Sequence, residues 1–428
     1  MAGILSMLAI TACSDNDAVE PVVDYDAVAD HTVLMYMVGD CNLSNVLENN
    51  VIQAHKAILD SVALGKINLV IFKDNKKTDD SLPKLYWVHR NATQRLDTVL
   101  LRTWDTEIDS ADPDLLADVV KTTFTRFNST LKGLVLASHG SSWIPLINTR
   151  TYGARRRAFG LDESTNGAGK GSIELWDLGE ALLQCPHLDY IITDCCHFGT
   201  AEVLYQLRDV TRYLVGSTAE VQGAGMPYQT VITRLSKCSS VADLPAALDY
   251  AALSYYNLNT PFNGDTRNGA TDAVYDLTAI SSLADSYQQL VQSNSERLNA
   301  IAQSSADEIA AWTDQHQEFG REYVSANGSV HYRYYFHDIV DAIDWMSEAN
   351  PAAAVTARTA VGQIVLSNYF SHDILTFNID HSSGLAVTLP QALELDKDSR
   401  YTHYFSPFSY SKLVSAYRMC DWGKKIGY

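Results

Sequence analysis

The fold of this chain is decided by residues 188–199, which read Leu188-Asp189-Tyr190-Ile191-Ile192-Thr193-Asp194-Cys195-Cys196-His197-Phe198-Gly199. The apolar run at 190–193 has the length of a buried strand, and the Thr-Ala-Glu-Val-Leu pattern that follows the stretch opens a helix. A cysteine between a buried strand and a helix lies at the carboxyl edge of a sheet. It is also near a helix N-terminus, whose dipole favours the thiolate. The stretch therefore predicts a thiol that is placed for chemistry.

A second stretch upstream has the same form. Residues 131–137 are an apolar strand, and Ser138-His139-Gly140 follows directly. Two parallel strands that end in His139 and in Cys196 bring a base and a nucleophile to one edge of the sheet. This pairing of residue types is the one that covalent acyl transfer by a cysteine requires.

Alternating strands and helices surround these two stretches. Strands are expected at 32–38, 67–72, 84–89, 131–137, 190–193 and 213–216, and helices at 43–59, 112–126, 175–184, 200–207 and 228–235. Continuous apolar strands separated by helices predict a parallel sheet covered on both faces, with its ligand site beyond the carboxyl ends of the strands.

The character of the sequence changes after residue 250. Helices are expected at 251–256, 277–312 and 334–346, strands at 374–379 and 384–389, and the tail is rich in aromatic residues. We therefore expect an α/β domain at 31–250 and a smaller mixed domain of helices and strands at 251–428.

Composition excludes several classes of function. The chain has 428 residues and a formal net charge of −19, without a basic stripe, which argues against a nucleic-acid partner. Three contiguous residues at 195–197 cannot converge on one metal ion, and the glycine-rich stretch 167–172 lacks the ending of a phosphate loop. No metal and no cofactor is expected.

The N-terminus indicates export. Residues 3–10 are apolar but too short to span a bilayer, and Ile10-Thr11-Ala12-Cys13 resembles the lipobox of bacterial lipoproteins. We expect a lipoprotein signal at 1–13 with lipidation of Cys13, an acidic linker at 14–30, and a place in the bacterial cell envelope. The anchor would be the only contact with the membrane. A plain signal peptide is the alternative, because residues 1–12 hold no Lys or Arg.

Several motifs in order resemble the clostripain-like cysteine peptidases, which are relatives of caspases, gingipains and legumains. These motifs are the strand and turn at 35–43, Ser138-His139-Gly140-Ser141-Ser142-Trp143, Thr193-Asp194-Cys195-Cys196, Glu202 to Asp209, and Gly225-Met226-Pro227-Tyr228. The resemblance implies a caspase-like α/β/α sandwich with a mostly parallel sheet, and the activity of a cysteine endopeptidase acting on peptides or proteins.

The resemblance also implies roles for individual residues. Cys196 matches the nucleophile and His139 the base, and the backbone N–H groups of Gly140 and Cys196 match the oxyanion hole. Asp194 matches an acid that recognises Arg or Lys before the scissile bond. Glu220 is a candidate for the second acid of that pocket, although Ala224 stands where an acid is expected, so basic specificity stays open. Cys195 is expected in the core.

Members of the resembled family cleave themselves after a basic residue between the histidine and the cysteine. The long polar loop between the two motifs carries Arg155, Arg156 and Arg157, which are therefore candidate self-cleavage sites. The alternative function is a surface binding protein that keeps the caspase fold without catalysis.

Overall fold

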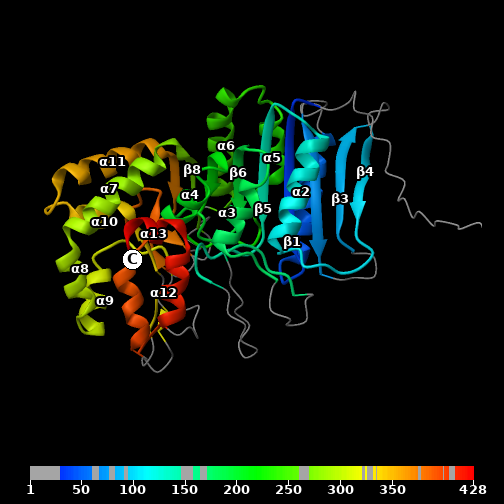
Figure 1. Cartoon of the computed structure of the whole chain (residues 1–428). Coiled ribbons are helices and arrows are strands. Elements are labelled where there is room, and N and C mark those ends of the chain that lie inside the picture. Colours follow the sequence, from blue (N-terminus) through cyan, green and yellow to red (C-terminus); the bar gives the residue numbers. More distant parts are fainter. Residues whose placement is uncertain are drawn as a thin grey trace, which may run out of the picture.

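The computed structural model describes residues 29–59, 67–76, 82–90, 95–145, 158–163, 171–259, 269–320, 323–324, 331–333, 335–374, 377–398, 400–403 and 410–428. At its centre is a nine-stranded sheet in the order β12-β8-β7-β6-β5-β1-β2-β3-β4 (Figure 1). Its strands are β1 (His31–Gly39), β2 (Asn68–Asn75), β3 (Lys84–Arg90), β4 (Leu96–Thr103), β5 (Leu131–Ala137), β6 (Leu188–Asp194), β7 (Thr211–Gly216), β8 (Thr271–Asp276) and β12 (Val365–Phe370).

The middle of the sheet is parallel and its two edges are antiparallel. The parallel pairs are β1 with β2, β1 with β5, β5 with β6, and β6 with β7. Antiparallel pairing adds β3 and β4 at one edge and β8 and β12 at the other. The central strands are buried on both faces, which is why their sequences read as unbroken apolar runs.

Helices cover both faces of the sheet, so the expected α/β/α sandwich is confirmed (Figure 1). One face holds α1 (Ser44–Leu59), α5 (Tyr228–Leu235) and α6 (Leu244–Asn259), and the other holds α2 (Pro113–Arg126), α3 (Leu175–Leu183) and α4 (Ala201–Gln206). Side chains of β1 alternate between these faces: Leu34 and Tyr36 belong to one hydrophobic cluster, and Val33 and Met35 to the other.

The C-terminal part is a group of helices and short strands that packs beside α4 (Figure 1). Its elements are α7 (Ile280–Ser293), α8 (Ser295–Ala302), α9 (Ala306–Thr313), β9 (Tyr323–Val324), β10 (His331–Arg333), β11 (Phe336–Asp338), α10 (Ile339–Met346), α11 (Pro351–Ile364), β13 (Asp373–Ile374), β14 (Phe377–Asn378), β15 (Ala386–Thr388), β16 (Tyr401–His403), α12 (Tyr410–Met419) and α13 (Asp421–Ile426), with 3₁₀ turns at Leu277–Ala279 and Pro390–Lys397. A further 3₁₀ turn, Val241–Asp243, precedes α6.

Three expectations for the C-terminal part are wrong in detail. The helix expected at 277–312 is broken near Asn294, whose side chain donates to the Leu290 and Met346 carbonyls, and again at Ser305, which caps α9. The segment 334–346 starts as strand β11, because Asp338 caps a helix that begins only at Ile339. Residues 373–378 form two short paired strands instead of one.

The sheet draws on residues from both sides of the boundary expected at residue 250. β8 and β12 lie beyond that boundary and extend the sheet next to β7. Within the described residues, none of the helices has the length and apolar character needed to cross a bilayer.

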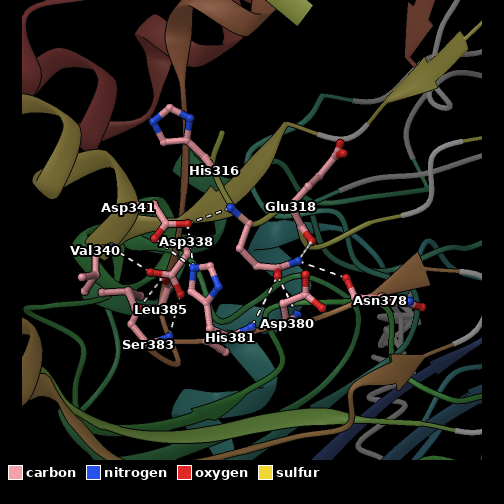
Figure 2. A network of polar contacts seen from close by, with 12 residues as sticks. His316, Glu318, Asp338, Val340, Asp341, Asn378, Asp380, His381, Ser383 and Leu385 are labelled. Atoms are coloured by element: carbon pink, nitrogen blue, oxygen red, sulfur yellow. Dashed lines mark hydrogen bonds and ion pairs between the residues drawn. The ribbon is translucent and has the colours of Figure 1, made fainter. Parts of the chain in front are cut away.

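A polar network in the C-terminal part holds the segment 377–385 against α10 (Figure 2). The backbone N–H of Gln317 donates to Asp341 at 2.7 Å, and the side-chain oxygen of Gln317 accepts from the Asp380 N–H at 2.7 Å. The His381 ring contacts Asp341 at 2.9 Å, and Asp338 accepts from the Ser383 N–H at 2.6 Å. The network positions β15, which follows directly in the chain.

Candidate active site

β5 and β6 place the two predicted catalytic residues at one edge of the sheet. The strands are parallel with Ala137 opposite Asp194, and the Ser138 N–H donates to the Asp194 carbonyl at 3.3 Å. His139 and Cys196 therefore follow adjacent strands at the same edge of the sheet. Both side chains are half-buried, so they are held by the protein and remain open to solvent.

Gly140 packs against the turn that carries the cysteines. A Cβ at this position would lie 2.8 Å from the Cys196 carbonyl oxygen and 2.9 Å from the Cys195 Cβ. Gly140 is also bridged to Phe159, and the hydrogen bonds of this bridge run from the Ser141 and Gly160 N–H groups. The Gly140 N–H takes no part in them, and only a residue without a side chain fits so close to Cys196.

Asn42, which lies in the turn of the motif at 35–43, orients the histidine. His139 Nε2 lies 2.8 Å from Asn42 Oδ1. Because an amide oxygen only accepts, Nε2 carries the proton, and Nδ1 is then the basic nitrogen of the neutral ring. The signal in the sequence was the position of Asn42, three residues after the carboxyl end of β1, which neighbours β5 in the sheet.

Cys196 has a hydrogen-bond donor for its sulfur. The Val221 backbone N–H points to Sγ at 3.3 Å, and a donor in this place favours the thiolate. The expected helix dipole does not serve this purpose: α4 begins at Ala201 with Thr200 as its cap, five residues beyond the thiol. The loop after β7, which carries Val221, supplies the donor that was expected from a helix N-terminus.

Cys195 is a core residue. It is 1% exposed and belongs to the hydrophobic cluster on the α2–α3 face. Burial, followed by the neighbouring Cys196 and Asp194, raises the pKa of the Cys195 thiol well above its ordinary value. A thiol that stays protonated is a weak nucleophile, so the two adjacent cysteines differ sharply in their environments.

Two residues beside the site adopt left-handed backbone angles. His197 follows the half-buried thiol with φ 59°, and Ser142 follows His139 by three residues with φ 57°. Such angles are costly for residues with a Cβ and persist only where the surroundings enforce them. The His197 ring stacks on Phe336 with centroids 4.8 Å apart, and Nδ1–H donates to the Thr218 carbonyl at 3.0 Å.

The C-terminal part supports the same turn. The Ala386 N–H donates to the Gly199 carbonyl at 3.0 Å, which pairs β15 with the residues just after His197. The Thr388 N–H donates to the buried Glu202 carboxylate at 2.9 Å. The turn that carries the thiol is therefore held between the sheet and the C-terminal part.

Asp194 is a buried carboxylate on the α1–α5 side of the site. It is 6% exposed, and its Oδ2 accepts from the Met226 N–H at 3.0 Å and from the Tyr228 hydroxyl at 2.8 Å. Burial raises the pKa of Asp194, and these two hydrogen bonds partly oppose the rise. Gly225 lies so close that a Cβ there would be 2.5 Å from Oδ2.

The two remaining residues considered for the pocket differ in burial. Glu220 is 8% exposed and precedes Val221, the donor to Cys196 Sγ. Ala224 is exposed in the same loop. Cys13 and Arg155, Arg156 and Arg157 lie outside the described residues.

One known protein family matches almost the whole chain. The profile of the clostripain family, peptidase C11, matches residues 35–428. Clostripain of Hathewaya histolytica is 25% identical over an alignment of 224 positions, which covers 48% of this chain and 42% of clostripain. The chain thus matches less than half the length of that curated relative.

The solved structures that are similar over most of the chain include two that differ in state. They are an inactive zymogen C11 protease from Parabacteroides distasonis and a secreted C11 cysteine protease from Bacteroides thetaiotaomicron in complex with an irreversible peptide inhibitor. Each is 21% identical with a TM-score of 0.67, over 93% of this chain and 98% and 99% of theirs. They share its fold, and the family profile spans the sheet and the C-terminal part alike: the chain belongs to the clostripain family of C11 peptidases.

Proposed function

We propose that this chain is an exported cysteine endopeptidase in which His139 activates Cys196, and that it cleaves after Arg or Lys. The observation that carries the proposal is the adjacency of the two strand ends, with Ala137 of β5 opposite Asp194 of β6. Asn42 would keep the His139 proton on Nε2, so that Nδ1 could take the proton of the thiol.

The chemistry is a covalent acyl transfer. The thiolate attacks the peptide carbonyl carbon, His139 gives its proton to the leaving amine as the C–N bond breaks, and water then releases the acyl group from the sulfur. The Gly140 and Cys196 N–H groups would receive the oxyanion, and the close packing of Gly140 on the Cys196 carbonyl supports this assignment. A digest of a peptide library by the purified protein tests the proposal, since a non-catalytic binding protein cleaves nothing.

Asp194 would recognise the basic side chain of the substrate. Both of its hydrogen-bond donors among the described residues go to Oδ2, and the carboxylate faces the side of the sheet where the Glu220–Gly225 loop lies. A carboxylate at the floor of a pocket selects Arg or Lys through a charge-assisted hydrogen bond. Glu220, which is also buried, would add to the negative potential.

Asp194→Asn should lose about 1.5–3 kcal/mol of the preference for Arg or Lys over a neutral side chain, the value of a hydrogen bond to a charged group. The measurement is kcat/KM on matched peptides that differ only before the scissile bond. Tyr228→Phe is the control, because it removes one donor to Oδ2 and leaves the charge. A wild-type profile led by apolar or acidic residues would contradict the assignment of Asp194.

The loop between the histidine and the cysteine would be cut by the protein itself. Arg155, Arg156 and Arg157 form its densest basic run. A similar structure is described as an inactive zymogen, which supports an activation step in this fold. The alternative is a solvated loop without a processing role.

Incubated wild-type protein should yield two fragments with a cut in 150–171, after Arg155, Arg156 or Arg157, whereas Cys196→Ala should stay intact. The fragments should remain associated, because β5 and β6 lie on opposite sides of the cut and pair in one sheet. N-terminal sequencing and size-exclusion chromatography give the two readouts. A wild type that is intact and fully active rules the activation step out.

Export is the remaining part of the proposal. The similar Bacteroides thetaiotaomicron protease is described as secreted, and the lipobox-like segment ending at Cys13 is what supports an anchored form here. An envelope enzyme fixed at Cys13 would carry its catalytic part on the acidic segment 14–30.

A further inference from the structure

A second acid lies on the same face of the sheet as Asp194. In the pairing of β6 with β7 and of β7 with β8, Ile192 is opposite Val215, and Val215 is opposite Val274. Side chains alternate along a strand, so Asp194, two residues beyond Ile192, shares the face of Ile192. Asp272 likewise shares the face of Val274, and because β8 is antiparallel, it lies at the same edge as Asp194.

Asp272 is buried, and hydrogen bonds satisfy its carboxyl group only in part. It is 1% exposed, and within the described part of the chain its Oδ2 has no hydrogen-bond partner. Burial raises the pKa of Asp272 well above its ordinary value, and Asp194 contributes to the rise. A buried carboxyl group with an unpaired oxygen is costly, and its strand neighbours Ala273 and Val274 are apolar core residues.

The surroundings connect Asp272 with the active site. The Tyr255 hydroxyl on α6 accepts from the Gln222 N–H at 2.9 Å, and the neighbouring Val221 N–H points to Cys196 Sγ. Burial raises the pKa of Tyr255 well above its ordinary value, and Asp194, Asp272 and Cys196 add to the rise. Within the described ranges, neither Asp194 nor Asp272 forms an ion pair with a lysine or arginine.

We propose that Asp272 is the second acid of the pocket for the basic side chain, in the role that Ala224 leaves vacant. This inference rests on the proposed function. Asp272 stands two strands from Asp194, with about 10 Å between the backbones, and it is less exposed than Asp194. It therefore acts on the bound cation through its charge, behind Asp194, and the arriving guanidinium or ammonium group favours the ionised carboxylate.

The test is the ratio of kcat/KM for an arginine peptide to that for the same peptide with citrulline, a neutral isostere. Asp272→Asn should lower this ratio by up to about tenfold, the effect of one fully ionised carboxylate at this range and an effective dielectric constant near 20. Glu180→Gln, which removes an exposed acid on α3, controls for net charge and should leave the ratio at the wild-type value.

Three outcomes are distinguishable. A wild type without preference for arginine refutes the proposed specificity itself, and the inference falls with it. A wild type that prefers arginine, with the same ratio in Asp272→Asn, overturns only the inference, because a protonated structural acid is replaced by asparagine without effect on selectivity. If Asp272→Asn does not fold, the smaller Asp272→Ser is measured against the same ratio.

Discussion

Cys196→Ala should abolish peptide cleavage, with a fall in kcat of about 10⁴-fold or more, the scale seen when a catalytic nucleophile is removed. The loss follows from the position of the thiol, half-buried at the strand end and facing the Val221 N–H. No other described cysteine leaves the strand adjacent to His139 except Cys195, whose side chain points into the core. Hydrolysis of an arginine peptide is the measurement.

Cys195→Ala is the matched control and should keep most of the activity. It removes one buried sulfur atom and should cost about 1 kcal/mol of stability. A thiol-reactive peptidyl probe adds a second readout: it should label wild type and Cys195→Ala, and should leave Cys196→Ala unlabelled. Activity that survived in Cys196→Ala and vanished in Cys195→Ala would exchange the roles of the two residues.

Much of the candidate site could be predicted because its two proposed catalytic residues follow directly on two strands. Continuous apolar runs, buried on both faces of the sheet, mark β5 and β6. The residues that follow them, His139 and Cys196, can therefore be placed at the carboxyl edge of the sheet from the sequence, without any knowledge of side-chain contacts. The order of motifs then predicted the family, which the profile over residues 35–428 confirmed.

The features that could not be predicted depend on contacts between residues far apart in the sequence. Asn42 contacts His139 across 97 residues, and Asp272 comes to the face of Asp194 only through the antiparallel register of β8. The stretch 271–276 has one acidic residue at its second position and one at its end. This sequence lacks the continuous apolar run that marks a buried strand, so it does not predict β8. Local propensity carries no information on such neighbours.

The prediction that a helix N-terminus stabilises the thiolate was wrong, and the reason is physical. A strand followed by a helical pattern predicted a helix N-terminus at the cysteine, but the αL residue His197 turns the chain first, and α4 begins only at Ala201. The turn brings the Cys196 backbone against Gly140. The same geometry that displaced the helix thus created the close contact on which the proposed oxyanion site depends.

Gly140→Ala should lower kcat about 10²–10³-fold, the cost of losing one oxyanion donor, and should destabilise the protein by about 1–3 kcal/mol through overpacking. The added methyl group would meet the Cys196 carbonyl oxygen at 2.8 Å and the Cys195 Cβ at 2.9 Å. The carbonyl oxygen is a backbone atom and the Cβ is bonded directly to the backbone, so neither can swing aside. The two strand ends must therefore separate, and the Gly140 N–H must move from the reacting carbonyl.

Gly223→Ala is the control for this variant, because a Cβ at Gly223 meets nothing within 4 Å. It lies in the loop that supplies the Val221 N–H, yet it should change stability by less than about 0.5 kcal/mol, as surface substitutions do. Thermal unfolding and kcat are measured for both variants. Wild-type kcat in a folded Gly140→Ala protein would refute the oxyanion role of this N–H, because the methyl group cannot be accommodated without moving it.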